Sequence, residues 1–178
     1  INDSSRLLER AASVFNLARA LLNVARNKGA AGVDGRSVEQ VVDDAPRLLP
    51  KLRRELLSGA YRPGDVRRVW IPKPGGGQRG LGIPNVVDRV VQQALLQVLE
   101  PLFEPTFHGS SHGFRPRRGA PTAIAEAKKY LEDGYVWTVD VDLSKFFDQV
   151  HHQRLLNRMP QQLEDDRILK LVHRLLKE

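Results

Sequence analysis

The 178-residue sequence contains no cysteine, a single methionine and few aromatic residues, which make up 6% of the chain. The lack of cysteine excludes a disulfide framework, a thiolate zinc site and a cysteine nucleophile. No apolar run approaches the ~18–20 residues that a membrane helix needs, so we expect a protein without a membrane-spanning segment. Charged residues interrupt the first leucines, which argues against a signal peptide.

Acidic residues are outnumbered, at 21 Asp and Glu against 28 Lys and Arg, giving a formal net charge of +7. This excess of cations favours a polyanionic partner, and nucleic acid is the default. The chain is 41% hydrophobic and 28% charged, a composition typical of globular rather than disordered proteins. We therefore expect a cytoplasmic protein, with a nucleoid-associated or organellar location left open.

Hydrophobic spacing predicts a mostly helical chain. In the first helix, residues 5–27, the apolar side chains that recur at three or four positions and should share one face are Leu7, Leu8, Ala11, Phe15, Ala18, Leu22 and Ala25. Ser37 and Gln40 have the spacing of a capping box and start a second, short helix. Pro46 and Pro50 predict a break after it, because an interior proline costs about 3 kcal/mol. Further helices are expected over residues 50–58, 85–99, 120–131, 151–158 and 164–177.

A two-stranded ribbon is predicted between the helices, from Val66–Lys73 and Arg79–Ile83 around a tip of three glycines. Between Tyr61 and Gly80 the ribbon carries five cations and one acid. Cations beside glycines suit a phosphate chain, because backbone N–H groups can approach oxygens that Lys and Arg neutralise. The Gly-Lys-Ser/Thr ending of a P-loop is lacking. An ordinary solvated hairpin with a basic face is the alternative.

One further strand is predicted over residues 136–141, and an acidic run follows it. Strand alternation sends Asp140 and Asp142 to the same face, where paired carboxylates can hold Mg²⁺. The alternative is that one aspartate caps the following helical turn. His108 and His112 are four residues apart, but neighbouring glycines argue against the helix that a zinc pair would need.

Several motifs together resemble group II intron-encoded reverse transcriptases, also called intron maturases, with retron-type and CRISPR-associated reverse transcriptases as relatives. In chain order the motifs are Gly32-Val-Asp-Gly35, Gly59-Ala-Tyr-Arg-Pro63, Val66-Arg-Arg-Val-Trp-Ile-Pro-Lys-Pro-Gly75, Arg79-Gly-Leu-Gly-Ile-Pro84, Asp88-Arg-Val-Val-Gln92, Ser111-His-Gly-Phe-Arg-Pro116 and Asp142-Leu-Ser-Lys-Phe-Phe-Asp148. The resemblance implies an α+β fold: a mostly helical fingers lobe with a β-ribbon, followed by the first strand and helices of a right-hand polymerase palm. It divides the chain into a helical amino-terminal extension (1–60), fingers with the basic ribbon (61–134) and the beginning of a truncated palm (135–178).

The resemblance also implies the site residues. Asp142 matches the first catalytic aspartate, whose carboxylate binds Mg²⁺ together with the carbonyl of the next residue, here Leu143; the complete enzyme uses two ions. Phe147 matches the aromatic that lies beneath the sugar and excludes a 2′-hydroxyl. Lys73 and Arg79 match residues that grip the incoming triphosphate. The remaining implied contacts are those of Arg115 with nucleotide or template, and of Arg62, Arg67 and Arg68 with nucleic acid.

The sequence departs from the family at one point, because it contains no Tyr-x-Asp-Asp. We therefore expect this chain to be an inactive fragment of an RNA-directed DNA polymerase. The parent enzyme is expected to extend a DNA primer on an RNA template with deoxynucleoside triphosphates and to assist intron splicing and mobility. The alternatives are an RNA-binding maturase module without its own catalysis, and a CRISPR-associated reverse transcriptase. A metal-dependent nuclease built on Asp140 and Asp142 is disfavoured, because no third carboxylate or base is evident. Exposed palm surfaces predict self-association, for instance as a homodimer.

Overall fold

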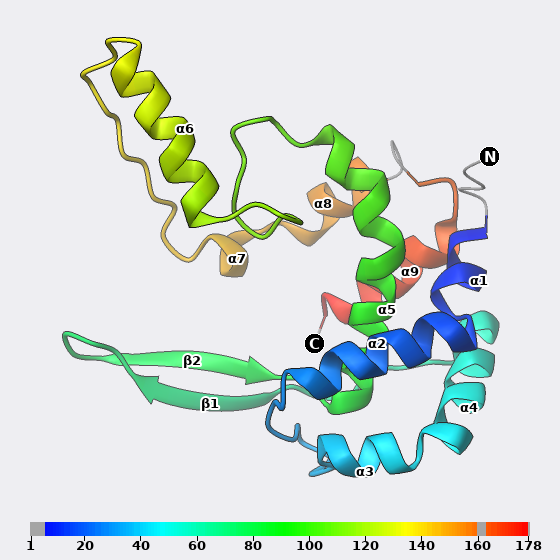
Figure 1. Cartoon of the computed structure of the whole chain (residues 1–178). Coiled ribbons are helices and arrows are strands. Elements are labelled where there is room, and N and C mark those ends of the chain that lie inside the picture. The colour runs from blue at the N-terminus through cyan, green and yellow to red at the C-terminus, as the bar shows by residue number, and fades with distance from the viewer. Residues whose placement is uncertain (1–5, 160–162, 178) are drawn as a thin grey trace. The chain divides into compact units, whose positions relative to one another are not determined.

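The computed structural model describes residues 6–159 and 163–177, and the chain divides into two compact units (Figure 1). Unit 1 combines residues 1–99 with residues 152–178, and unit 2 consists of residues 100–151. The described residues form mostly helices and a two-stranded antiparallel sheet, which confirms the α+β class. Among these residues, no helix combines the length and apolar character required to cross a membrane.

In the sequence, the two strands of the ribbon lie between a first set of helices, α1–α4, and a second set that begins with α5. Unit 1 holds α1 (Leu7–Ala11), α2 (Val14–Arg26), α3 (Val38–Asp43), α4 (Ala45–Ser58), β1 (Arg67–Pro72), β2 (Gln78–Ile83), most of α5 (Val86–Phe103), α8 (His152–Arg158) and α9 (Asp166–Leu175). Unit 2 holds the end of α5, the short 3₁₀ helix η2 (Glu104–Thr106), α6 (Ala120–Glu132) and α7 (Phe146–Gln149).

The single helix predicted over residues 5–27 is wrong in two respects, and its first residue lies outside the described residues. The structure has two helices, because Ser13 leaves the helical conformation and caps α2 by accepting a hydrogen bond from the backbone N–H of Asn16. This break changes the phase of the buried face. Leu17, Ala20, Leu21 and Val24 are buried, whereas Phe15 is 80% exposed and Leu22 is 59% exposed.

The predicted break after the second helix is present at Asp44, but the next helix, α4, begins at Ala45 instead of Pro50 and continues through Pro50. A proline inside a helix removes one N–H donor and strains the preceding turn. Leu49, Leu52 and Leu56 are all buried on the same helix, and burying a leucine contributes about 1.5–3 kcal/mol. The apolar face of α4 therefore offsets the penalty. In the same way α5 extends past Leu99, its predicted end, and contains Pro101.

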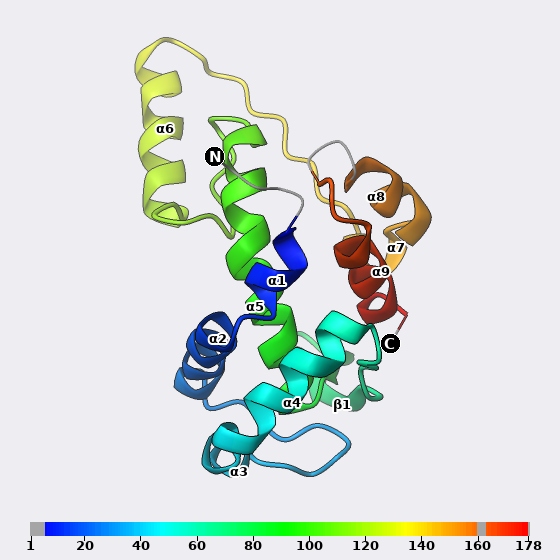
Figure 2. The same cartoon turned by 90° about the vertical axis from the view of Figure 1, so that its right-hand side faces the viewer.

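The core of unit 1 joins helices from both ends of its sequence. Helix α2 packs against α3 and α4, α1 packs against α2, α4 and α9, and α8 packs against α9 (Figure 2). The largest fully buried side chains include Leu7 of α1, Leu17 of α2, Leu52 of α4 and Ile168 of α9. The helices predicted near the end of the chain are thus confirmed, and they complete the core that the first helices begin.

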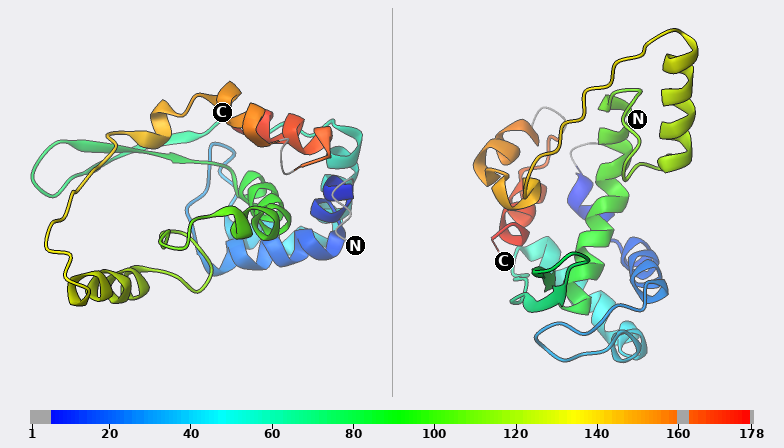
Figure 3. Two further views of the ribbon diagram at one scale, coloured as in Figure 1. Left: turned by 90° about the horizontal axis from the view of Figure 1, so that it is seen from above. Right: turned by 90° about the vertical axis from the view of Figure 1, so that its left-hand side faces the viewer.

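The strand predicted over residues 136–141 is wrong. Residues 135–143 form neither helix nor strand and are drawn as coil in Figure 3. A strand needs a neighbouring strand to pair its backbone groups. Within the described residues, β1 and β2 are the strands present, and they pair with each other. Val136, Trp137 and Val139 are consequently 77%, 92% and 86% exposed.

Candidate functional site

The basic ribbon of unit 1 is antiparallel, with Arg67 opposite Ile83 and Ile71 opposite Arg79. Directly opposed residues share a face of the sheet, and successive residues alternate between faces. Arg67 and Arg79 therefore lie on one face, and Arg68 lies on the other. No hydrogen bond or ion pair joins these three guanidinium groups to another side chain in the described part of the chain, and almost the whole ribbon is exposed. Both faces can approach a polyanion.

The ribbon tip is a glycine turn closed at Lys73. The Lys73 N–H donates to the carbonyl of Gly77 at 3.0 Å, and the Gly76 N–H donates to the carbonyl of Lys73 at 3.2 Å. Gly75, Gly76 and Gly77 have φ of +94°, +97° and +83°, values that L side chains rarely adopt. The sequence needs all three glycines to bring Lys73 and Arg79 to the same end of the ribbon.

Arg62 differs from the ribbon arginines, because its guanidinium is used within the chain. Its Nη1 donates to the carbonyls of Gly59 at 2.8 Å and Tyr61 at 2.9 Å. Arg174 of α9 donates to the same two carbonyls. Arg62 therefore helps to complete the C-terminal end of α4, where Gly59 has a φ of +71°.

The root of the ribbon, where β1 begins and β2 ends, is held by a buried polar cluster at the start of α5. Asp88 is 5% exposed, and its Oδ1 accepts a hydrogen bond from the hydroxyl of Tyr61 at 2.5 Å. Its Oδ2 accepts from the N–H of Gly64 at 3.1 Å and from Nδ2 of Asn85 at 3.0 Å. Oδ1 of Asn85 accepts in turn from the N–H of Asp34 at 3.1 Å. The Asp88 carboxylate thus connects the segment before β1 with Asn85, which follows β2, and Asn85 extends the connection to the loop before α3.

In unit 2, Asp142 and Leu143 line a cavity of about 400 Å³ together with Ser144, Phe146, Gln149 and Val150. Asp142 is exposed, and its carboxylate makes no hydrogen bond or ion pair in the described part of the chain. A carboxylate, a carbonyl and a hydroxyl are oxygen donors of the kind that Mg²⁺ prefers. The described residues contain no cluster of three or more Asp, Glu, His or Cys. The donor set therefore fits Mg²⁺ with most ligands coming from water or phosphate.

The adjacent Phe146 and Phe147 differ in their surroundings. Their rings pack edge to face with centroids 5.4 Å apart. Phe146 is 51% exposed and lines the cavity, whereas Phe147 is 81% exposed and is free to meet a ligand. Lys145, just before them, has a φ of +51° and turns the chain into α7.

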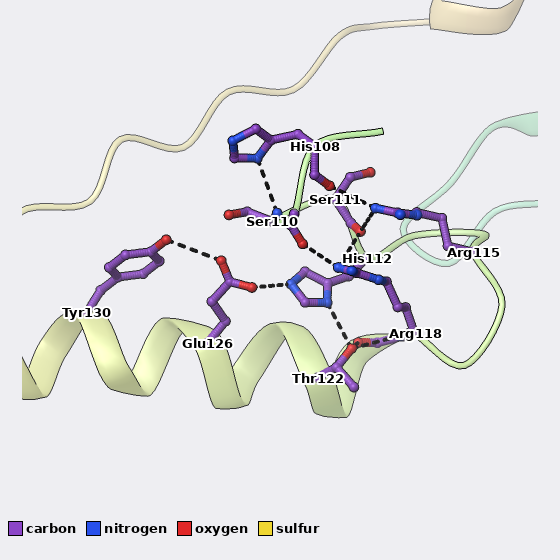
Figure 4. Close-up of polar contacts among 11 residues, drawn as sticks. His108, Ser110, Ser111, His112, Arg115, Arg118, Thr122, Glu126 and Tyr130 are labelled. Carbon is purple, nitrogen blue, oxygen red and sulfur yellow. Dashed lines mark hydrogen bonds and ion pairs between the residues drawn. The ribbon is translucent and has the colours of Figure 1, made fainter. Parts of the chain in front are cut away.

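Arg115 braces a loop of unit 2 (Figure 4). Its Nε and Nη2 donate to the carboxylate of Glu104 at 3.0 and 2.8 Å, and its Nη1 donates to the carbonyls of His108 and Ser111 at 2.8 and 2.9 Å. Its side chain is 7% exposed and its guanidinium lies 5.4 Å from the ring centroid of Phe107. The hydrogen bond from Arg115 lowers the pKa of Glu104. Every nitrogen of this guanidinium is therefore engaged within the loop.

His112 joins the same loop to α6 (Figure 4). Its Nδ1 lies 2.8 Å from the hydroxyl of Thr122, and its Nε2 lies 2.8 Å from a carboxylate oxygen of Glu126. Tyr130 donates to the other oxygen of Glu126 at 3.2 Å. Hydrogen bonds from Ser110 and then from His112 lower the pKa of Glu126. His112 thus has a hydrogen-bonding role in place of the zinc role that the sequence already disfavoured.

Residues 71–175 match the family model described as "Reverse transcriptase (RNA-dependent DNA polymerase)". The chain belongs to the reverse transcriptase family. It is 40% identical over 167 residues to protein YkfC of Escherichia coli (strain K12), and the matched region covers 90% of this chain and 44% of YkfC. It is 33% identical over 164 residues to the group II intron-encoded protein LtrA of Lactococcus lactis subsp. cremoris, which covers 89% of this chain and 26% of LtrA.

A COX1/OXI3 intron 2 protein of Saccharomyces cerevisiae is also similar, with 35% identity over 130 residues, 72% of this chain and 15% of the yeast protein. The reverse transcriptase chain thus spans less than half the length of each of these relatives. Their names place group II intron-encoded proteins among its relatives, and the resemblance that the motifs carry is confirmed.

The predicted site residues of this reverse transcriptase chain fall into both units. The ribbon residues and Arg62 belong to unit 1, and Asp142, Leu143, Phe147 and Arg115 belong to unit 2. Sequence reasoning missed the residues that hold these side chains in place, among them Asp88 and Glu104. The signal for Asp88 in the sequence is its place in the first turn of a predicted helix, three residues after Asn85. The partnership of Glu104 with Arg115 left no signal in the spacing.

Proposed function

We propose that this chain is part of an RNA-directed DNA polymerase of the group II intron type, which extends a DNA primer on an RNA template. The observation that carries the proposal is the family match over residues 71–175, a range that includes most of the ribbon and Asp142. In this proposal residues 1–60 are the amino-terminal extension, 61–134 the fingers and 135–178 the beginning of the palm, and the protein acts in the cytoplasm.

Asp142 is the proposed catalytic carboxylate and, with the carbonyl of Leu143, would hold Mg²⁺. The exposed carboxylate on a cavity lined by oxygen donors supports this role. When bound, the metal supplies charge stabilisation for the transfer of a phosphoryl group, and a complete enzyme uses two ions. The second carboxylate position would come from a Tyr-x-Asp-Asp, which the 178 residues do not contain.

Lys73 and Arg79 are the proposed ligands of the triphosphate. Their support is geometric, because the glycine turn brings both cations to the exposed end of the ribbon. Phe147 is proposed to lie under the sugar of the incoming nucleotide, and its 81% exposed ring is free for this contact. Arg115 is proposed to act near the template through the loop that it braces, since its own donors are engaged.

The decisive experiment compares primer extension by this chain and by the longer protein from which it derives. The longer protein should incorporate deoxynucleotides on an RNA template, and Asp142→Asn should abolish this activity. Asp140→Asn is the matched control, since Asp140 is a neighbouring exposed carboxylate without an assigned role. The isolated chain should be inactive. Incorporation by the isolated chain would refute the need for a second carboxylate, and full activity of Asp142→Asn would refute the assignment of Asp142.

A second function, RNA binding without catalysis, is favoured by the arginines exposed on both faces of the ribbon. Each neutralised phosphate contributes about −0.7 to −0.9 to the slope of log K against log salt. Replacing Arg67 and Arg68 together by Gln should therefore reduce the slope by up to about 2. The same double substitution at Arg47 and Arg54, which are exposed on α4, is the control. An equal effect of both pairs would mean that binding follows net charge and not the ribbon.

A further inference from the structure

Three of the motifs, Gly32–Gly35, Gly59–Pro63 and Asp88–Gln92, are joined by hydrogen bonds to Asp88 and Asn85. Asp34 belongs to the first motif, Tyr61 to the second, and Asp88 opens the third. The Asp88 cluster consists of these residues with Gly64 and Asn85, joined by the hydrogen bonds described above. Buried charges are costly unless they are hydrogen-bonded, and Asp88 receives three such bonds. A cluster of this kind fixes the segments that it connects.

Two glycines adapt the surrounding backbone to this cluster. A Cβ on Gly64 would overlap the side-chain nitrogen Nδ2 of Asn85, and a Cβ on Gly32 would lie 2.6 Å from the backbone Cα of Asn85. Distances below 3.0 Å force something to move, and here one neighbour is backbone, which cannot give way cheaply. Neither glycine has a positive φ, so close approach to Asn85, and not backbone conformation, is what requires glycine at both positions.

The cluster holds both strands of the ribbon at its root, where β1 begins and β2 ends. Gly64 precedes the first residue of β1 by three positions, and Asn85 follows the last residue of β2 by two. Beyond these attachments, β1 and β2 contact each other and pack on no helix in the described part of the chain. Figure 1 shows the ribbon projecting from the helices of its unit. The hydrogen bonds of Asp88 therefore lie at the point where the ribbon joins its unit.

The length of the ribbon makes its tip sensitive to that root. Lys73 is nine residues beyond Gly64, a reach of roughly 30 Å at about 3.3 Å per residue. A rotation of about 10° at the root would therefore move the tip by about 5 Å. Misplacement by about 1 Å can already weaken a catalytic arrangement strongly.

We propose that Asp88 and Asn85 are positioning residues, which aim the ribbon and so place Lys73 and Arg79 for a triphosphate. The proposal rests on the phosphate-binding role proposed above for Lys73 and Arg79. It adds that this role depends on a buried carboxylate at the opposite end of the ribbon, which touches no nucleotide itself.

Two measurements on the 178-residue chain test this proposal. The first is the distance distribution between spin labels on the ribbon and on α4, introduced as Gln78→Cys and Arg54→Cys, since both sites are exposed and the chain has no cysteine of its own. The second is the affinity for inorganic tripolyphosphate. Asp88→Asn, which keeps the size of the side chain and removes its charge, should broaden the distribution and weaken the affinity roughly three- to tenfold through lost preorganisation. Gly64→Ala should do the same.

Controls separate positioning from general destabilisation. Leu52→Ala removes a fully buried side chain of α4 and should lower the melting temperature without changing the distance distribution or the affinity of the folded protein. Gly109→Ala, where a Cβ meets nothing within 4 Å, is the matched control for Gly64→Ala. Tyr61→Phe removes one of the three hydrogen bonds to Asp88 and should give an intermediate effect.

The outcomes distinguish the two proposals. If tripolyphosphate binds no more weakly to a Lys73→Ala, Arg79→Ala variant than to the unaltered chain, the role of the ribbon as a phosphate site is wrong, and the label distances alone still decide whether Asp88 aims the ribbon. If the distance distribution in Asp88→Asn matches that of the unaltered chain, the positioning proposal is wrong, whatever the affinity. If Leu52→Ala broadens the distribution equally, the effect is general loosening and the proposal is also wrong.

Discussion

Oδ2 of Asp165 accepts a hydrogen bond at 3.0 Å from the backbone N–H of Leu8, which lies 157 residues earlier in the chain. The same carboxylate caps α9 by accepting from the N–H of Arg167. Arg167 then donates to both carboxylate oxygens of Glu9 at 2.7 and 2.8 Å. One aspartate therefore satisfies free N–H groups at the starts of two helices and joins the two separate stretches of unit 1.

Replacing Asp165 by Asn should destabilise unit 1 by about 2 kcal/mol, because the hydrogen bonds to a charged acceptor are lost and an amide N–H₂ faces the Leu8 donor. Chemical denaturation followed by circular dichroism measures this change. Asp43→Asn is the control, since Asp43 is exposed at the end of α3 and its carboxylate makes no hydrogen bond or ion pair with the described residues. Equal destabilisation by both variants would contradict the special role of Asp165.

The stability of unit 1 should also fall in acid. Burial acts to raise the pKa of Asp165, but the hydrogen bonds from Arg167 and from the Leu8 N–H outweigh it, so the pKa lies below its ordinary value. The hydrogen bond from Arg167 likewise lowers the pKa of Glu9. Carboxyls with lowered pKa values stabilise the folded state fully above their unfolded values, near 4, and lose this contribution as the pH falls below them.

Denaturation curves at pH 6, 4 and 3 check this dependence. The difference in unfolding free energy between the unaltered chain and Asp165→Asn should be largest at pH 6 and should shrink at pH 3. A difference that stays constant from pH 6 to pH 3 would mean that the ionised carboxylate is not what stabilises the contact.

Arg115→Lys should loosen the loop that follows α5 without unfolding the protein. Lysine keeps the positive charge but cannot donate at once to the Glu104 carboxylate and to the carbonyls of His108 and Ser111. Hydrogen exchange of the amides between residues 104 and 118 should accelerate roughly tenfold. Arg117→Lys is the control, because Arg117 is exposed and its guanidinium makes no hydrogen bond or ion pair within the described chain. Unchanged exchange in Arg115→Lys would show that the brace contributes little.

In the longer polymerase proposed above, Phe147→Ala should raise the incorporation of ribonucleotides relative to deoxyribonucleotides. A steric gate rejects one additional hydroxyl through strain of about 1–3 kcal/mol, so the selectivity should fall roughly ten- to two-hundredfold. Phe146→Ala is the matched control, since Phe146 lines the cavity beside Asp142 and should affect folding or overall rate instead. If both variants change the ratio equally, the register of this motif is wrong and Asp142 loses support.

The exposed apolar segment of residues 135–143 should promote self-association of the isolated chain. Val136, Trp137 and Val139 together present a large apolar surface, and within the described residues no strand pairs with their backbone groups, which favours contact with a second chain. Val139→Lys should lower the association constant in sedimentation equilibrium, because burying the new charge is costly. Val14→Lys, at another exposed valine, is the control. A strictly monomeric unaltered chain at high concentration would contradict this expectation.

Local sequence signals predicted the elements that local chemistry determines. The three glycines between two β-rich runs were sufficient for the ribbon, and Ser37 with Gln40 forms the capping box that their spacing indicated. The failures involve distant partners. Pro50 is tolerated because leucines of α4 are buried, and residues 136–141 lack a strand beside them.

The positions of polar side chains show the same division. Asp142 could be selected from its motif, but the burial of Asp88 and Asp165 depends on residues 24 to 157 positions away. Pairs at such separations leave no periodicity in a single sequence. The sequence therefore marks Asp88 as a residue near a helix start, but it does not reveal the distant partners of Asp88 and Asp165.

The interruption of unit 1 by residues 100–151 has a consequence for synthesis on the ribosome. At about 5–20 residues per second, Leu8 waits roughly 8 to 30 s before Asp165 is made. During that interval Leu7 and Leu8 lack the α9 surface that later buries them, so the nascent chain exposes an apolar surface. This exposure lasts far longer than the time in which a helix forms. A chaperone that binds short apolar segments would find its target there, and release would coincide with the arrival of α9.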